Sequence, residues 1–502
     1  MAVAEREDER AGRPGGDRVA PPMRWWLFAA LPVAVAIAWA NAFPGAFQFD
    51  DYAVVVDNPA VQRWTAFVAS MPGIRPLLKA SYTFSWTSGG GAPTAFVALN
   101  VVVHAANAVL VMLLARRVLA LAAPELRPRT GIAVATALLF ALHPAQTEAV
   151  TWIAGRATSL SACFVLASVL LWLAGADAVY AGDTARARLR RTAAMAAFVA
   201  ALAVKETAAT LPFALLLLEA LRRVVREPGS HAQGAAPARP WRDALRATLW
   251  PFALLALAVA AAWSLPTYRR LVAASLDTRG PFANLAAQVD AIAYLVTGPL
   301  LRLRVNIDPE VPLTAFGPQW WLAAAALTAA ALVAAAGLAA RPAAGPPAAW
   351  RSPLVGFALA WFLLHLAPTN SLLARFDLAN DRQLYLALLG PALLVAAALP
   401  AWRARRGSAP PASVLALVPA ALLAAVLGAA TIARNRDYAT EIALWEATVR
   451  TAPSRARAWN NLGYAYEQAG RRADARRAYE RALSLDPGQF KARSNLDLLG
   501  DP

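Results

Sequence analysis

The feature that most constrains the fold is a series of apolar runs, each about 15–22 residues long, that recurs along most of the chain. A helix needs about 20 consecutive apolar residues to cross a bilayer. The 502 residues are 59% hydrophobic and only 16% charged, which is not the composition of a soluble domain. The sequence therefore predicts an all-α, polytopic membrane protein.

Eleven spans are expected if the moderately apolar segment 284–301 is re-entrant or interfacial. If that segment instead crossed the membrane, the arginines of every later loop would change sides, which the positive-inside rule disfavours. The expected spans are 25–42, 96–114, 132–142, 160–176, 193–204, 208–221, 248–265, 320–338, 353–366, 384–399 and 414–430.

The net charge of +17 comes from arginines that cluster in short loops between the apolar runs. This is the positive-inside pattern of a membrane protein, so nucleic acid is not expected as a partner. The arginines of residues 1–24 predict a disordered cytoplasmic tail before an uncleaved first span. The alanine- and arginine-rich composition is typical of a high-GC prokaryote, which makes the cell (inner) membrane the expected location. The single cysteine, Cys163, lies in an apolar run and predicts neither a disulfide framework nor a thiolate metal site.

The tail after residue 433 changes character and carries a tetratricopeptide-repeat pattern. Trp445 and Pro453 precede Tyr479 and Pro487 by 34 residues each, which is the length of that repeat. The matching positions are Ala458, Trp459, Gly463, Tyr466, Gly470, Ala475, Tyr479, Ala482 and Pro487. The expected domains are a tail (1–24), a transmembrane domain (25–433) with a first outer loop (43–95), and a short α-solenoid of repeats (434–502) outside the cytoplasm.

Two adjacent carboxylates, Asp50 and Asp51, follow the first span and belong to the first outer loop. A carboxylate pair held against a bilayer suits deprotonation of an acceptor, or binding of a cation, beside a lipid-borne substrate. The simpler interpretation is a solvated turn after a membrane anchor.

Further polar residues gather on the same predicted side. Lys205 is one of only three lysines; it is either a cation for a lipid phosphate that Glu206 orients, or one half of a Lys205–Glu206 ion pair. Two arginines of one loop, Arg375 and Arg382, can clamp a phosphate, and Tyr385 closes that loop.

The segment after the third span adds three candidates. His143 precedes a proline and is either a helix end or, less favoured, a metal ligand. Glu148 and Arg156 are eight residues apart, so they can share one helix face, as ion-pair scaffolding or as substrate contacts.

A set of motifs runs in order along the chain: Phe49-Asp50-Asp51, Asn58-Pro59, Asn100 with His104, His143-Pro144 with Glu148, Trp152 and Gly155-Arg156, Lys205-Glu206, and Asp381-Arg382 with Tyr385. In this order, the motifs resemble those of the transmembrane and tetratricopeptide-repeat-containing O-mannosyltransferases and their prokaryotic relatives, within the GT-C superfamily. This chain has Asp381-Arg382 where the family has Glu-Arg, and its repeat array is far shorter than in the eukaryotic members.

The resemblance implies inverting transfer of a mannose-like hexose from a polyprenyl-phosphate donor to an acceptor hydroxyl at the non-cytoplasmic face. It implies Asp50 or Asp51 as general base, and Arg156, Lys205 and Arg382 as cations for the leaving phosphate. The acceptor, which the repeats would hold or recruit, is left open between protein, glycan and lipid. No cofactor is certain; a divalent cation, Mg or Mn, is left open.

Two other classes of function predict sequence features that differ from those of the transferase. A non-catalytic membrane scaffold that recruits protein partners through its repeats predicts loss of the outer carboxylates, yet both are present. A transporter or flippase predicts ionisable residues at mid-membrane and internal inverted repeats. Here the ionisable residues cluster at one predicted face and no internal duplication is evident. The sequence therefore favours the transferase.

Overall fold

A computed structural model describes residues 26–500 except 44, 72, 127, 227–239, 315, 340–351, 371–373 and 406–416. Every regular element in these residues is helical, which confirms the all-α class. The predicted tail 1–24 and most of the basic loop 226–246 lie outside the described residues.

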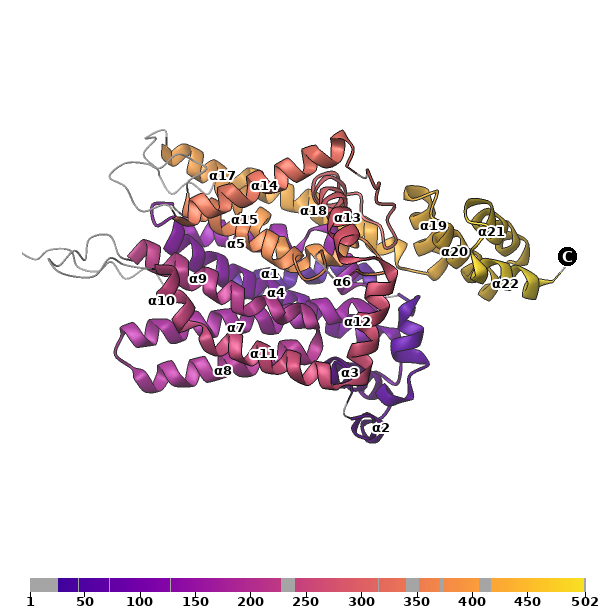
Figure 1. The fold of residues 1–502 in the computed structure, drawn as a ribbon, viewed down its shortest axis with the longest axis horizontal. Coiled ribbons are helices and arrows are strands. Elements are labelled where there is room, and N and C mark those ends of the chain that lie inside the picture. Colours follow the sequence, from indigo (N-terminus) through magenta and orange to yellow (C-terminus); the bar gives the residue numbers. More distant parts are fainter. Residues whose placement is uncertain are drawn as a thin grey trace, which may run out of the picture.

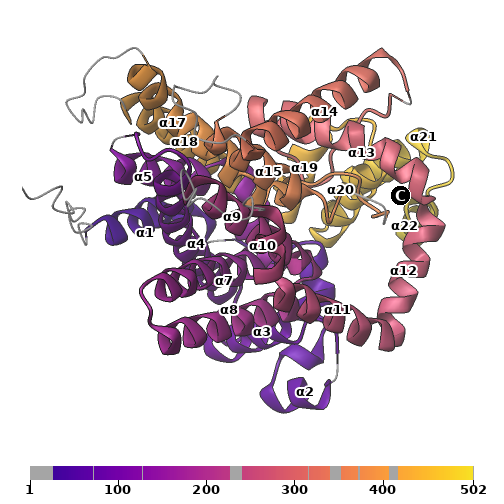
Figure 2. The same cartoon turned by 60° about the vertical axis from the view of Figure 1, so that its left-hand side comes forward.

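A bundle of long helices makes up most of the molecule, with its helices running side by side in both views (Figures 1 and 2). Proline occupies the first turn of α3, α4, α15 and α18, where its missing N–H costs no helical hydrogen bond. The bundle comprises α1 (Trp26–Trp39), α3 (Pro76–Gly89), α4 (Pro93–Ala122), α5 (Arg129–Ala141), α7 (Arg156–Tyr180), α8 (Thr184–Val204), α9 (Leu211–Arg226), α11 (Leu249–Ser264), α14 (Pro318–Ala339), α15 (Pro353–Leu366), α17 (Leu389–Arg405) and α18 (Val418–Asp437).

Shorter helices lie between and across the bundle helices. They are α2 (Trp64–Ala69), α6 (Thr147–Val150), α10 (Pro240–Ala247), α12 (Pro266–Thr278), α13 (Pro281–Leu295) and α16 (Leu384–Ala387). The repeat helices project from one end of the bundle, called the repeat end below (Figure 1). They are α19 (Glu441–Thr451), α20 (Ala456–Gln468), α21 (Arg472–Leu485) and α22 (Phe490–Leu499).

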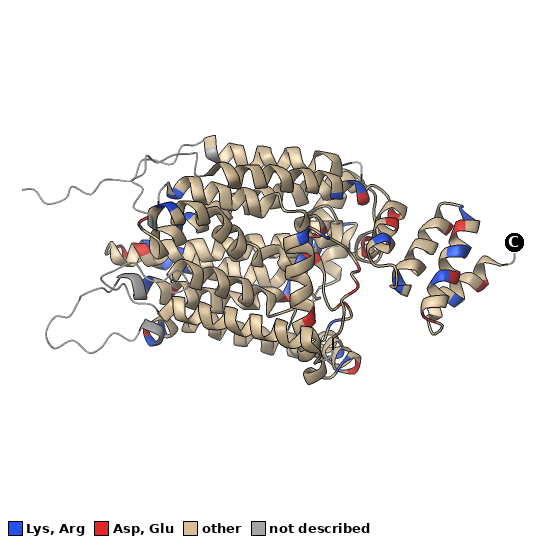
Figure 3. Cartoon of the chain, turned by 90° about the horizontal axis from the view of Figure 1, so that it is seen from above, with Lys and Arg blue, Asp and Glu red and all other residues tan. Residues whose placement is uncertain are grey.

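Among the described residues, four helices are long and apolar enough to cross a membrane, and six if each of two bent pairs is one span. Three shorter apolar helices, which correspond to α1, α5 and α15, accompany them. Charged residues gather at the two ends of the bundle and on the repeats, and are sparse between (Figure 3). The polytopic membrane class is therefore confirmed, while the count of eleven spans stays a prediction.

The segment 284–301 is not among the helices that meet the length and composition criteria for a span. It forms α13 and a π-helical turn, Val296–Leu300. In Figure 1, α13 is seen nearly end-on, whereas α4, α7 and α8 lie lengthwise, so α13 runs across the bundle. The neighbouring α12 turns 89° away from α11. These directions favour the re-entrant or interfacial alternative.

Several predicted boundaries were wrong. The basic stretch 186–191, expected to be a loop, lies inside α8, whose first turn is capped by the Asp183 carboxylate accepting from the Arg186 N–H at 2.9 Å. Helix α4 likewise continues past Arg116 and Arg117 to Ala122. Arginine is a good helix former, and its long side chain reaches water while the backbone stays helical.

The segment 57–86 of the predicted first outer loop has apolar residues at helical spacing, but it does not form one continuous helix. It breaks into α2 and α3, because Pro76 starts α3 and Arg75 takes a left-handed backbone conformation with φ 51°. The break turns the Arg75 side chain toward Glu206.

The repeat helices pack as the repeat spacing predicts. Gly463 of α20 faces the ring of Tyr479 in α21, where a Cβ atom would lie 2.6 Å from the ring carbons. Only glycine allows this close approach. Aromatic residues of the repeat end pack against α19: the Trp152, Tyr438 and Trp445 side chains share one buried cluster. The repeats are thus joined to the bundle by packing as well as by the chain.

Candidate functional site

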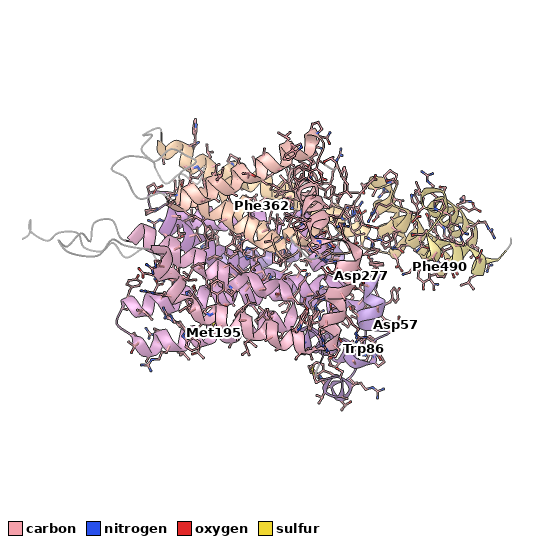
Figure 4. The ribbon with its side chains drawn as sticks, in the orientation of Figure 1. Asp57, Trp86, Met195, Asp277, Phe362 and Phe490 are labelled. Atoms are coloured by element: carbon pink, nitrogen blue, oxygen red, sulfur yellow. The ribbon has the colours of Figure 1, made fainter. Side chains whose placement is uncertain are left out.

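A cavity of about 310 Å³ opens at the repeat end of the bundle, between the loop after α1, helix α3, the start of α7 and the junction after α8. Figure 4 labels Asp57, seven residues after Asp50, and Trp86 of α3 in this region. Among the described residues, its charged lining consists of Asp50, Arg75, Lys79, Lys205, Arg375 and Arg382. We call it the cationic cavity, because five cations surround a single carboxylate.

Asp50 supplies that carboxylate. It follows Phe49, which adopts φ 48°, a left-handed conformation that non-glycine residues seldom take. Burial raises the pKa of Asp50, and the positive charge of Arg382 offsets part of that rise. A carboxylate with a raised pKa is a stronger base, provided that it is ionised at the working pH.

Asp51 is held away from the cavity. Its Oδ2 accepts from the Gln48 N–H at 3.0 Å and its Oδ1 accepts from the Ala154 N–H at 2.7 Å. The side chain is only 1% exposed and is not part of the cavity lining. Burial raises the pKa of Asp51 to about 8. The two N–H groups that donate to the carboxylate favour its ionised form and so oppose this rise. The two adjacent aspartates therefore have different surroundings: Asp50 faces the cavity, and Asp51 ties the loop to the turn before α7.

Lys205 lies in the cavity wall, but not in the pairing expected from the sequence. Its Nζ donates to the Thr158 hydroxyl at 2.7 Å, and the described residues give it no ion pair. Burial, with the charges of Arg382 and Arg375, holds the pKa of Lys205 well below its usual range. An unpaired, partly buried cation of this kind gains stability when an anion binds.

Glu206 turns to a different partner. Its carboxylate accepts two bonds from Arg75 Nε, at 3.0 and 3.2 Å, and one from Arg75 Nη2 at 2.7 Å. The Tyr268 hydroxyl also donates to it, at 3.0 Å. The expected orientation of Lys205 by Glu206 is therefore wrong: Glu206 positions Arg75 in the cavity wall instead.

Arg382 and Glu148, which are 234 residues apart in the sequence, form a largely buried ion pair. The Arg382 backbone N–H donates to Glu148 Oε2 at 2.9 Å, and its Nη1 lies 3.2 Å from Oε1. The Arg382 guanidinium stacks 4.9 Å above the Trp152 ring. Glu148 thus fixes the direction of Arg382. Burial raises the pKa of Glu148, and Arg382 opposes that rise.

Arg375 makes no hydrogen bond or ion pair with any described residue, although it lines the cavity. Burial and the nearby charge of Arg382 lower its pKa to about 10. The loop therefore brings a second, uncompensated guanidinium beside Arg382, as the phosphate-clamp hypothesis requires.

Arg156 does not reach the cavity. Its Nε donates to Asn100 Oδ1 at 2.6 Å, and its two terminal nitrogens donate to the Ser81 and Phe96 carbonyls at 2.8 and 2.9 Å. It is 0% exposed. The helix face that it was expected to share with Glu148 is absent, because the chain breaks between α6 and α7. Arg156 is a cross-link between α3, α4 and α7.

Replacing Arg156 with leucine is expected to destabilise the protein by about 3 kcal/mol or more, because a buried amide oxygen and two carbonyls lose their donor. The measurement is the thermal unfolding midpoint in detergent. An unchanged midpoint would contradict the cross-linking role.

His143 and Tyr385 also lie outside the cationic cavity. His143 Nδ1 accepts from the Ala145 N–H at 3.2 Å and caps a short helical turn, and burial lowers its pKa to about 4. The Tyr385 hydroxyl is buried between His104 Nδ1 at 2.7 Å and Asn107 Nδ2 at 2.9 Å. Both side chains serve the packing of the bundle rather than the cavity wall.

The sequence reasoning missed Arg75, Lys79 and Thr158. Lys79 could have been found because it is one of only three lysines in the chain. Arg75 could have been found because it precedes Pro76, which starts a helix. A smaller adjoining cavity of about 40 Å³ was missed too. It shares Thr158, Lys205, Arg375 and Arg382 with the cationic cavity and adds His365 and Gln383.

No group of three histidine, cysteine, aspartate or glutamate side chains comes together within the part of the chain that the structure describes. The cationic cavity offers only Asp50 among five positive side chains, which repel a cation. The divalent cation left open from the sequence therefore stays a prediction, without a described set of ligands.

Comparisons with known proteins agree with this picture. The tetratricopeptide-repeat family model matches residues 456–489. The protein O-mannosyl-transferase TMTC1 of Mus musculus is 30% identical over 197 residues, 35% of this chain and 20% of its own length. TMTC3 of Mus musculus is 31% identical over 155 residues (28% and 16%), and Tmtc1 of Drosophila melanogaster is 40% identical over 94 residues (18% and 10%). No solved structure matches the chain.

The chain thus aligns with about a fifth of the length of the mouse TMTC1 protein. Within that share, the similarity agrees with the motifs that suggested the family, and the repeat match agrees with the 34-residue spacing. The resemblance of this chain to the transmembrane and tetratricopeptide-repeat-containing protein O-mannosyltransferases is therefore confirmed.

Proposed function

We propose that this protein is a membrane glycosyltransferase that moves a mannose-like hexose from a polyprenyl-phosphate donor to an acceptor hydroxyl, with inversion, at the non-cytoplasmic face. The observation that carries the proposal is the cationic cavity, in whose described lining Asp50 is the single carboxylate among five cations. The names of the relatives, protein O-mannosyl-transferases, support the sugar and the reaction class.

The proposed reaction needs one base and a cationic site for the leaving group. Asp50 accepts the proton of the acceptor hydroxyl as that oxygen attacks the anomeric carbon of the sugar. The bond from that carbon to the phosphate oxygen breaks on the opposite face, and the electron pair leaves with the polyprenyl phosphate. A single displacement of this kind inverts the anomeric centre.

The charge of the phosphate accounts for the cations. A phosphodiester-linked sugar carries one negative charge, and the departing monoester gains a second as the bond breaks. Lys205, Arg375 and Arg382 line both the cationic cavity and its smaller neighbour, so they can follow the phosphate through this change. Donors that bind the leaving group more tightly as its charge grows lower the barrier. The leaving group then needs no proton.

Three further residues hold the cations of the cavity in place. Glu148 orients Arg382, Glu206 orients Arg75, and Thr158 holds Lys205. The protein or glycan that supplies the hydroxyl enters from the repeat end, where Asp50 lies.

The first test is donor turnover by the purified protein. Three lipids would be offered in nanodiscs: polyprenyl-phosphate mannose, polyprenyl-phosphate glucose, and a polyprenyl phosphate without sugar. The readout is release of the sugar. Turnover of one sugar donor that is lost in Asp50→Asn supports the transferase. If no sugar donor binds or turns over, and the aspartate variants behave like the wild type, the repeat-bearing scaffold becomes the better description.

The pH dependence of kcat/KM is expected to be bell-shaped. Asp50 acts when deprotonated, so activity falls as the pH drops through its raised pKa, above the ordinary aspartate value of about 4. Lys205 binds phosphate when protonated. Burial and the charges of Arg382, Arg375 and Arg75 lower the pKa of Lys205, and Glu206 opposes this shift. As the pH rises, Lys205 therefore loses its proton, and the enzyme its activity, at a lower pH than an ordinary lysine would.

The control for the alkaline limb is Lys205→Arg, since arginine stays charged throughout. This variant is expected to keep the acid limb and to lose the alkaline one. An alkaline limb that persists unchanged in Lys205→Arg would assign it to another group.

A further inference from the structure

Arg457, at the start of α20, links the repeat domain to the bundle through hydrogen bonds to two aspartates. Arg457 Nε donates to Asp308 Oδ2 at 2.8 Å, and its Nη2 donates to Asp308 Oδ1 and to Asp377 Oδ1, both at 2.6 Å. The guanidinium also stacks 4.9 Å from the Phe376 ring. Arg455 donates two more bonds to Asp308 Oδ1, from Nε at 3.2 Å and from Nη2 at 2.7 Å. Asp308 is 2% exposed, so this is a partly buried, bidentate pairing rather than a surface contact.

Asp377 connects this contact to the cationic cavity. It lies two residues after Arg375 and five before Arg382, in the segment that supplies two cations to the cationic cavity. Residues 374–380 form no helix. Arg382 is fixed by Glu148, but Arg375 has no hydrogen-bond or ion-pair partner among the described residues. The contacts of Arg457 with Asp377 and Phe376 therefore restrain the backbone beside Arg375.

The repeat domain also contacts the loop that carries Asp50, the proposed base. Phe49, immediately before Asp50, donates its N–H to Glu441 Oε1 of α19 at 3.3 Å. Its ring packs edge-on against Trp445 of α19, with centroids 5.3 Å apart. Phe49 holds a left-handed φ of 48°, a costly conformation that persists only where its surroundings impose it. Helix α19 is part of those surroundings.

We propose that the repeat domain completes the active site: Arg457 is a positioning residue that fixes the Arg375 segment, while α19 fixes the loop of Asp50. The inference rests on the proposed function for its kinetic consequences. The contrasting role is a plain tether, in which Arg457 holds the repeats near the membrane without affecting the cavity. A tether predicts that both loops stay ordered when the contact is cut.

The test compares Arg457→Gln and Asp377→Asn with the matched control Arg471→Gln. Arg471 also pairs with an aspartate, Asp474, but within the repeat domain and at its surface. The readouts are kcat and donor KM with polyprenyl-phosphate mannose, and amide hydrogen exchange over residues 374–382. Asp377→Asn removes the negative charge, and so the ion pair, from the bundle side of the contact and leaves the Arg457–Asp308 bonds in place, so it remains informative if Arg457→Gln fails to fold.

Arg457→Gln and Asp377→Asn are each expected to raise donor KM about tenfold, since a charge-assisted contact to the donor is no longer pre-organised. Both are expected to speed exchange over 374–382, while Arg471→Gln stays within about twofold of the wild type. Wild-type KM and exchange in Asp377→Asn would overturn the positioning role, even if Arg457→Gln loses stability. Should the wild type turn over no donor, the proposed function fails instead, and exchange over 374–382 still decides whether Arg457 orders the segment.

Discussion

Asp50→Asn is expected to lower kcat by about 10²–10⁴-fold, the usual contribution of a positioned general base, with the folded yield unchanged. Asparagine keeps the size of the side chain but cannot take a proton from the acceptor hydroxyl. The Asp50 carboxylate accepts no hydrogen bond from the described residues, so the substitution breaks no hydrogen bond among them. The measurement is single-turnover transfer of radiolabelled sugar from the lipid donor.

The neighbouring Asp51→Asn is the control, and its expected failure is different in kind. Both Asp51 oxygens accept backbone N–H groups, and an asparagine can offer only one oxygen. One buried N–H then faces the new amide group, at a cost of about 1–3 kcal/mol. We expect a lower thermal unfolding midpoint, with residual activity in the molecules that fold. Equal loss of kcat in both variants, at equal stability, would remove the assignment of the base to Asp50.

Arg375→Gln is expected to weaken donor binding about 10- to 100-fold, because a hydrogen bond to a charged group contributes about 1.5–3 kcal/mol. The same substitution is expected to leave the protein as stable as the wild type, or more so. Burial and Arg382 lower the pKa of Arg375, which means that the folded state disfavours its charge. Removing that charge relieves repulsion, since the described residues give Arg375 no carboxylate partner. Such opposition of stability and function is characteristic of a binding site.

Arg382→Gln is the matched comparison. It removes a cavity cation too, but it leaves Glu148 buried without its guanidinium partner. Truncating one member of a buried pair costs about 3–5 kcal/mol, so this variant is expected to lose stability as well as donor binding. Thermal unfolding and donor KM are measured for both. A stable Arg382→Gln, or an Arg375→Gln with wild-type KM, would contradict this division of roles.

Several features of the site could be read from the chain because their signals are local. The carboxylate pair, the rare lysine and the loop arginines all stood out against an apolar background. Asp50, Lys205, Arg375 and Arg382 do meet at one cavity. The same background made Arg156 and His143 look like site residues. A buried polar residue that serves packing has the same sequence signal as one that meets a substrate.

Hydrophobic runs and a 34-residue spacing are properties of neighbouring positions, so the sequence by itself determined the helical membrane class and the tetratricopeptide repeat. The pairing of groups was decided only by the tertiary structure. Glu148 and Arg382 are 234 residues apart, Arg75 and Glu206 are 131 apart, and Arg457 and Asp377 are 80 apart. The separate surroundings of Asp50 and Asp51 likewise depend on the Ala154 N–H, 103 residues from Asp51. Charge and burial at such a site come from segments that only folding brings together, and these set both the pKa of a group and the partner it holds.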